Sequence, residues 1–133
     1  MKRSRKVLKF TKSPSVKKRL IYLIKKLELN WIVPSRIFVY SSVGSKTRAY
    51  ARIWGLSKLW QNTLNVKPSY IVEVISQHYD KLSDHEKDRV LMHELTHIPK
   101  NFSGALVPHT HRRKGSFRDI LRKLYASYNS SRR

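Results

Sequence analysis

The segment from Ser83 to Pro99 constrains the fold of this chain more than any other, because it contains signals for both ends of a helix. Ser83, with Glu86 three residues later, matches a capping box, the pattern that stabilises a helix N-terminus. Apolar residues follow at helical spacing, and Pro99 is expected to stop the helix. The sequence therefore predicts a helix over residues 84–98.

This helix carries a His-Glu-x-x-His motif at residues 93–97. Positions four apart lie on one helix face, with Cβ atoms about 5–6 Å apart, so His93 and His97 can bind the same metal ion. Glu94 projects beside them and can reach a water molecule on that ion, as in zinc hydrolases. We therefore predict two metal ligands and a general base here. The simpler alternative is that both histidines only decorate the helix surface.

A catalytic zinc ion takes three protein ligands and keeps its fourth position for water. Lys100 and Ser103 occupy the positions where a metzincin has glycine and histidine, so that subclass is excluded. The only acid after the motif is Asp119, which argues against a glutamate ligand from a later helix. Two histidines remain downstream. We predict His109 as the third ligand, with His111 as the alternative.

A longer pattern surrounds the motif. Residues 91–109 continue into His-Ile-Pro and a later Gly-x-x-x-Pro-His, and read LMHELTHIPKNFSGALVPH. This segment resembles the putative phage metallopeptidase family, a group of small zincin-like proteins of phages and archaea. Residues 51–56 and 70–74 are similar to its upstream strands, so the resemblance covers roughly residues 34–114.

The resemblance implies a zinc peptidase with a zincin-like fold. Its ligands and general base would be His93, His97, His109 and Glu94. In the family pattern an aspartate usually follows the last histidine, whereas this chain has Thr110 there. An aspartate at that position could orient a ligand from outside the coordination shell.

The charge of the chain indicates a polyanionic partner. Its 133 residues contain 29 Lys and Arg against 8 Asp and Glu, a formal net charge of +21. The basic residues are concentrated at both ends, which is typical of proteins that bind nucleic acid. We expect RNA or the ribosome as the partner. The predicted nucleic-acid-binding side chains are Lys2, Arg3, Arg5, Lys6, Lys9, Lys12, Lys17, Lys18, Arg19, Arg112, Arg113 and Lys114.

An anionic membrane surface is the competing partner, because residues 16–29 form an amphipathic pattern. The same pattern is more common in a helix that packs on the core of a small domain. No apolar run has the length of a membrane-spanning helix, and the basic N-terminal stretch lacks the apolar segment of a secretory signal. With no cysteine in the chain, we expect a cytoplasmic protein.

A chain of this length has room for one domain with a modest core. We predict a small α+β zincin-like domain at residues 14–128, with a basic extension at 1–13 and a basic tail at 129–133. A short antiparallel sheet would pack with an N-terminal helix, the motif helix and a C-terminal helix. The expected helices cover residues 14–28, 84–98 and a segment from about 116. Strands or extended pieces are expected at 36–41, 48–53, 59–64 and 70–74, a turn at 77–82, and Trp54 in the core.

Two functions are compatible with these patterns. The first is an active zinc peptidase that binds nucleic acid through its basic ends. The second is a catalytically silent RNA-binding protein with a zincin fold, such as a ribosomal or ribosome-associated component. The presence of Glu94 favours the first, whereas the charge, the small size and Thr110 favour the second.

Overall fold

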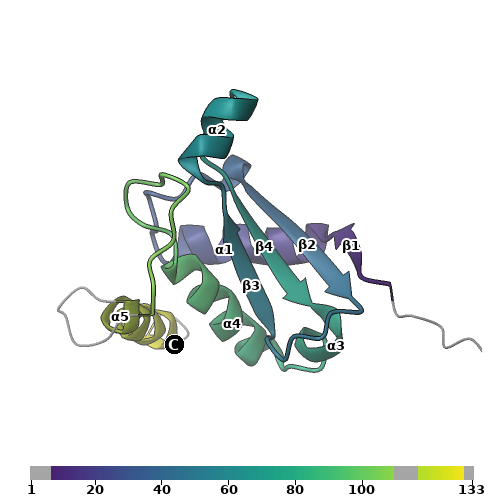
Figure 1. The fold of residues 1–133 in the computed structure, drawn as a ribbon. Helices are drawn as coiled ribbons and strands as arrows, with labels where there is room; N and C mark the ends of the chain where they lie inside the picture. The colour runs from purple at the N-terminus through teal and green to yellow at the C-terminus, as the bar shows by residue number, and fades with distance from the viewer. Residues whose placement is uncertain (1–6, 110–116, 131–133) are drawn as a thin grey trace, which may run out of the picture.

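A four-stranded mixed sheet organises the protein, with its helices gathered mainly on one side (Figure 1). We describe it from a computed structural model, which covers residues 7–109 and 117–130. The strand order is β1 (Lys9–Lys12), β2 (Ile37–Val43), β4 (Tyr70–Ile75) and β3 (Ala51–Gly55). The helices are α1 (Pro14–Lys26), α2 (Lys58–Leu64), α3 (Ser76–Tyr79), α4 (Asp84–Thr96) and α5 (Phe117–Ser130), with a 3₁₀ turn at Pro34–Arg36. This is the α+β class that the sequence predicts.

Strand direction differs from the sequence prediction in the middle of the sheet. β1 pairs with β2 and β3 pairs with β4 in antiparallel fashion, but β2 and β4 run parallel. The chain leaves β2, forms β3 and α2, and only then returns to place β4 between β2 and β3. Val72, Val74 and Ile75 of β4 are buried, as expected for a central strand with a parallel neighbour. Apolar patterning reports burial but not direction, so the prediction of an antiparallel sheet was wrong for this pair.

The hydrophobic core lies between the sheet and helices α1 and α4. Leu20 and Leu23 of α1, Leu91 and Leu95 of α4, and Val72 of β4 are all almost completely buried. The apolar side of α1 therefore packs on the core, as is common for such a pattern in a small domain. None of the helices in the described part of the chain combines the length and apolar character needed to cross a bilayer.

The motif helix forms where the sequence predicts it. The Ser83 hydroxyl accepts a hydrogen bond from the Glu86 amide at 3.2 Å, and the Glu86 carboxylate accepts one from the Ser83 amide at 3.2 Å. Acidic residues in the first turn also complement the helix dipole. α4 ends at Thr96, two residues before the predicted end, because His97 acts as its C-cap.

Two predictions were wrong, one for Trp54 in β3 and one for the segment that follows this strand. Residues 59–64 form helix α2 rather than a strand, because the Ser57 hydroxyl caps its N-terminus and Asn65 ends it in the left-handed conformation. Trp54 is half-exposed rather than in the core. It lies on the open face of the sheet and donates an indole hydrogen bond to Glu73 at 2.9 Å. Because successive side chains of β3 point to opposite faces of the sheet, the large ring of Trp54 lies on the surface.

The N-terminal part of the chain extends the sheet. Residues 9–12, which the sequence analysis assigned to the basic extension, pair with β2 as strand β1. All four of its side chains are exposed. Residues 1–6 and 131–133, at the two basic ends, lie outside the described residues.

A buried carboxylate joins three helices. Asp88 of α4 accepts hydrogen bonds from the Arg19 guanidinium of α1 at 2.7 and 2.5 Å, and from the Tyr128 hydroxyl of α5 at 2.7 Å. Burial alone raises the pKa of Asp88, but the bonds from Arg19 and Tyr128 outweigh it, so the pKa lies below its ordinary value. This cluster holds α5 against the helix that carries the motif.

Replacing Asp88 with asparagine is expected to lower the free energy of unfolding by about 2 kcal/mol at neutral pH, because charge-assisted hydrogen bonds are lost. A depressed carboxyl pKa stabilises the fold above the pKa of the unfolded state, and that stability disappears as pH falls through the folded-state value. The difference between wild type and Asp88→Asn in urea unfolding should therefore shrink below about pH 4. Asp80→Asn, at an exposed carboxylate, is the control and should have little effect at either pH. An equal difference at both pH values would contradict this role.

Candidate metal centre

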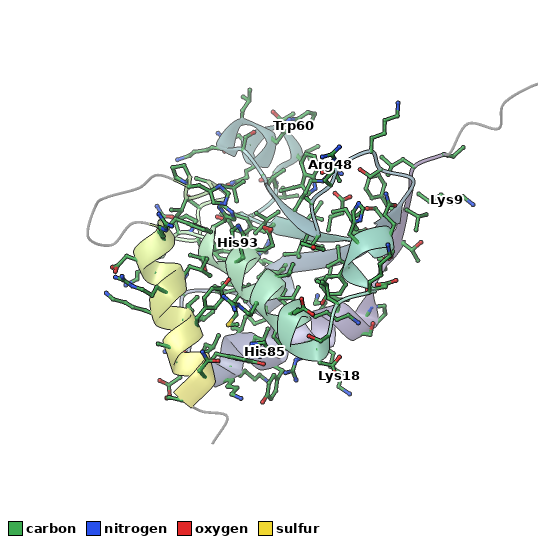
Figure 2. All side chains as sticks on the ribbon, turned by 90° about the horizontal axis from the view of Figure 1, so that it is seen from below. Lys9, Lys18, Arg48, Trp60, His85 and His93 are labelled. Carbon is green, nitrogen blue, oxygen red and sulfur yellow. The ribbon has the colours of Figure 1, made fainter. Side chains whose placement is uncertain are left out.

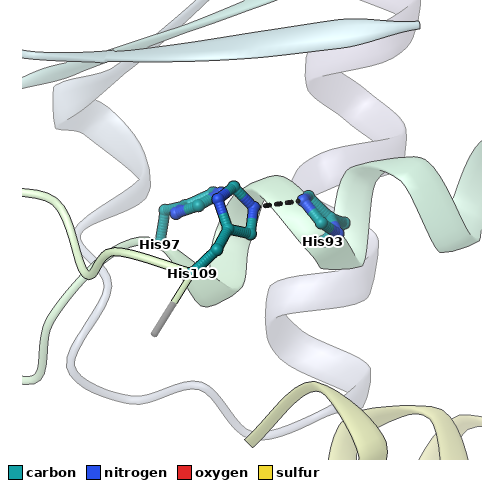
Figure 3. A group of neighbouring side chains, drawn as sticks. All are labelled: His93, His97 and His109. Atoms are coloured by element: carbon teal, nitrogen blue, oxygen red, sulfur yellow. Dashed lines mark hydrogen bonds between the residues drawn. The ribbon is translucent and has the colours of Figure 1, made fainter. Parts of the chain in front are cut away.

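Three histidines from two distant segments meet at the C-terminal end of α4 (Figure 3). His93 and His97 lie on the helix, and His109 comes from the loop that follows it. Nitrogens from the three rings lie within 4.8 Å of one another, and the Nε2 atoms of His93 and His109 are 3.0 Å apart. Two nitrogens bound at roughly 2.0–2.1 Å to one tetrahedral ion lie about 3.3–3.4 Å apart, so these two rings would separate only slightly around an ion. The three side chains can therefore hold a metal ion.

The backbone of the return loop orients His97. The carbonyl of Val107 accepts a hydrogen bond from His97 Nδ1 at 2.7 Å, and the Val107 amide donates to the His97 carbonyl at 2.7 Å. The first bond fixes the ring and leaves Nε2 as the free ligand atom. Metal-binding histidines commonly use their second nitrogen in this way, with a carboxylate or a backbone carbonyl as acceptor. Here a carbonyl does this for His97. Thr110, where the family pattern has aspartate, lies outside the described residues.

Two buried side chains fix the path of the loop before it reaches the site. The Tyr70 hydroxyl accepts a bond from the Gly104 amide and donates to the Ala105 carbonyl, both at 2.8 Å. The Gln61 amide donates to the Leu56 and Ser103 carbonyls, both at 2.8 Å. Gly104 has a φ of +93°, and a Cβ there would lie 2.2 Å from the Leu56 carbonyl oxygen. Only glycine fits this crossing, which holds the segment leading to His109.

An aromatic ring from the C-terminal helix closes one side of the histidine cluster. Phe117, the first residue of α5, is buried, and its ring centroid lies 4.9, 4.3 and 4.6 Å from those of His93, His97 and His109. This contact restricts the rings and removes water from that side. Phe117 falls in the segment from about residue 116 that the sequence predicts as a helix, and no local signal marks its position beside the site.

The environment of the two helix histidines, His93 and His97, keeps them neutral. Burial, followed by the neighbouring His97 and His109 rings, lowers the pKa of His93 to about 4. Burial also lowers the pKa of His97, although the bond to the Val107 carbonyl opposes this effect. Neutral imidazoles have the free lone pair that a metal requires, so these two ligands are ready for a metal at neutral pH.

Glu94 lies beside the histidines in a cleft of about 500 Å³. One wall of the cleft is edge strand β3, through Ala51, Arg52, Ile53 and Trp54, and the remaining lining includes Glu94, Leu106 and the three histidines. Burial raises the pKa of Glu94 to about 8, and no described residue forms a hydrogen bond or ion pair with its carboxyl. A cation at the histidines would favour the charged carboxylate. The carboxyl is therefore free to take a proton from a molecule in the cleft.

The predicted nucleic-acid-binding residues lie away from this cluster. Lys9 and Lys18 are distant from His93 in Figure 2, and Lys12 and Lys17 come from the same N-terminal region of β1 and α1. Arg19 is paired with Asp88 instead of being free for a phosphate. The other predicted residues lie outside the described part of the chain, namely Lys2, Arg3, Arg5, Lys6, Arg112, Arg113 and Lys114, as does the alternative ligand His111.

Comparison with protein families gives an independent result for this geometry. The family model described as putative phage metallopeptidase matches residues 8–129, which is most of the chain. The chain belongs to this family. No curated protein and no solved structure gave a significant match. Family membership and the three-histidine cluster together support a metallopeptidase-like protein with a metal site.

The match to the phage metallopeptidase family begins at residue 8, just before β1, and extends into α5. Both elements therefore belong to the region that defines the family, although the resemblance noted in the sequence covered only about residues 34–114. Gln61 and Tyr70, which anchor the return loop, lie inside that narrower region and still escaped sequence reasoning. Their side chains form hydrogen bonds with a segment more than thirty residues further along the chain, so no local pattern reveals them.

Proposed function

We propose that this protein is a zinc-dependent peptidase, with His93, His97 and His109 as ligands and Glu94 as the general base. Support comes chiefly from one observation, the unpaired carboxyl of Glu94 beside the three histidines in the same cleft. Three nitrogen ligands with an open side suit zinc, which the family assignment alone does not specify. When bound, zinc acts as a Lewis acid on water and on the scissile carbonyl.

The residues of the chain have separate tasks in this reaction. The Glu94 carboxylate accepts a proton from the attacking water and passes it to the leaving amine. β3 is the edge strand beside the cleft, so an extended peptide can align along it by main-chain hydrogen bonds. Exposed apolar side chains at that wall, Trp54 and Leu106, would contact the substrate side chains.

Digestion of a denatured protein or a peptide library by the zinc-loaded protein tests this function. Mass spectrometry should detect new amino termini, and chelation should prevent their formation. Comparison with the Glu94→Gln protein assigns any cleavage to this site, as argued in the Discussion. Absence of cleavage by the zinc-loaded wild type would favour the silent binding protein instead.

We also propose that the protein binds nucleic acid, with RNA as the preferred partner. Support comes from the net charge of +21 and from the burial of several acidic side chains. Three of the eight carboxylates, Glu73, Asp88 and Glu94, are buried, and the first two neutralise only Arg52 and Arg19, so few acids remain on the surface to offset the other basic side chains. Such a surface attracts phosphates regardless of sequence.

Binding to RNA should weaken steeply with salt, because each neutralised phosphate releases counterions, with a slope of about 0.7 per contact on single strands. Removing residues 1–6, which carry four basic side chains, should flatten the slope by up to about 3 units without removing β1. Replacing Arg112, Arg113 and Lys114 with alanine should flatten it further. The measurement is RNA affinity across a salt series.

Lys81→Ala is a suitable control for this series. Lys81 is exposed and lies between Asp80 and Asp84 in the sequence, so its loss should change the slope little. Weak binding to RNA that does not depend on salt, together with tight binding to anionic vesicles, would contradict the proposal and favour a membrane partner.

A further inference from the structure

The open face of the sheet carries exposed aromatic rings from three strands. Phe10 of β1, Phe38 of β2 and Trp54 of β3 are 54%, 45% and 50% exposed. Val39 of β2 and Val72 of β4, which alternate with the exposed positions of their strands, are buried in the core beneath the helices, so the rings project from the opposite face of the sheet. A shallow groove of about 370 Å³ follows this face and is lined by Phe10, Tyr40, Trp54, Ile71 and Glu73. Soluble domains rarely expose so many large rings together without a partner.

The strand register arranges this face in rows. Phe38, Ile71 and Trp54 lie opposite one another across β2, β4 and β3 and form an apolar row. The next row contains Lys12, Tyr40, Glu73 and Arg52, so it begins and ends with a cation. Further charge lies close to the rings. The Lys17 ammonium is 5.7 Å from the centre of Phe38, and the Arg52 guanidinium is 5.3 Å from that of Trp54.

The single acid of the four strands offsets only one of these cations, Arg52, and leaves Lys12 and Lys17 without a carboxylate from the sheet. Glu73 is 1% exposed and accepts bonds from Arg52 at 3.2 and 3.0 Å, from Trp54 at 2.9 Å and from Ser42 at 2.6 Å. Burial alone raises the pKa of Glu73, but these bonds outweigh it and lower the pKa. The carboxylate is thus saturated by the protein, and it holds Trp54 and Arg52 in position at the edge of the face.

We propose that this open sheet face binds single-stranded nucleic acid by stacking unpaired bases on Phe10, Phe38, Tyr40 and Trp54. Lys12 and Lys17 contact the phosphates of the same strand. The inference rests on the nucleic-acid binding proposed above and gives it a location other than the basic ends. Exposed rings beside cations suit unpaired bases, whereas bases inside a duplex are already stacked on one another. A second copy of this chain fits less well, because two faces of the same positive charge repel.

Comparing a short oligothymidylate with an abasic strand of equal length tests this site in the full-length, zinc-loaded protein. The two strands carry the same phosphates, so charge alone binds them equally. Stacking should make the normal strand bind at least roughly fivefold more tightly, and Phe38→Ala or Phe10→Ala should each remove much of that preference. Phe38→Tyr keeps a ring and should retain it. Fluorescence anisotropy at a fixed salt concentration provides the affinities.

Leu59→Ala is the matched control, because Leu59 is exposed and apolar but belongs to α2, outside this face. It should leave the preference unchanged. Equal affinity of the wild type for both strands would overturn the sheet-face site while leaving charge-driven nucleic-acid binding intact. Binding to neither strand, even at low salt, would overturn both. A wild-type dimer that Phe38→Ala converts to a monomer, with no change in base preference, would assign the face to self-association instead.

Discussion

Replacing Glu94 with glutamine is expected to reduce peptide cleavage by at least about 10²–10⁴-fold while zinc stays bound, because the change removes the general base and no ligand. Glutamine has almost the same shape as glutamate, and Glu94 makes no hydrogen bond or ion pair with any described residue. The substitution should therefore leave the fold intact. Initial rates on a peptide substrate and zinc content by elemental analysis, measured on the same samples, test both parts of this expectation.

The control for this experiment is Glu86→Gln on the same helix. Glu86 belongs to the capping box at the opposite end of α4, so its loss affects helix stability but not proton transfer. It should retain full cleavage at a temperature where the protein is folded. Equal cleavage by wild type and Glu94→Gln would remove Glu94 from the mechanism. No cleavage by either, with zinc bound in both, would support the catalytically silent alternative.

Local sequence signals predicted the parts of the fold that depend on neighbouring residues. The capping box and Pro99 defined α4 to within two residues, because both act over a single helical turn. The apolar run at 70–74 likewise identified β4. The error in residues 59–64 was avoidable, since Ser57 and Asn65 mark the two ends of α2. There the apolar residues outweighed the capping signals in our interpretation.

The remaining features depend on contacts between distant segments. The parallel pairing of β2 and β4 follows from the path of the intervening chain, and the exposure of Trp54 follows from which face of the sheet the helices leave uncovered. In the candidate site, too, one contact follows from local spacing and another from the packing of distant segments. A four-residue spacing on one helix brings His93 and His97 together, whereas Phe117 reaches them only through the packing of α5 on α4. Such contacts leave no periodic signal in the sequence.

Replacing a histidine ligand with alanine is expected to have the second large effect, a loss of zinc binding. Wild-type protein should bind about one zinc per chain, and His93→Ala or His97→Ala should abolish that binding. The expected loss of affinity exceeds the 10–100-fold cost of removing a hydrogen-bond partner of a ligand, because a direct metal bond disappears. His109→Ala should also lose zinc, and a greater effect than that of His111→Ala would distinguish the predicted third ligand from its alternative.

His85→Ala supplies the control for the zinc measurement, because His85 lies two turns earlier on α4 and outside the three-histidine cluster. It should keep full zinc occupancy even if it changes stability. Zinc content must be measured at neutral pH, where low pKa values keep His93 and His97 unprotonated. As the pH falls, protons compete for the same lone pairs and zinc is released. Full occupancy in purified His93→Ala would show that zinc binds elsewhere, and Glu94 would then have no metal beside it on which to act.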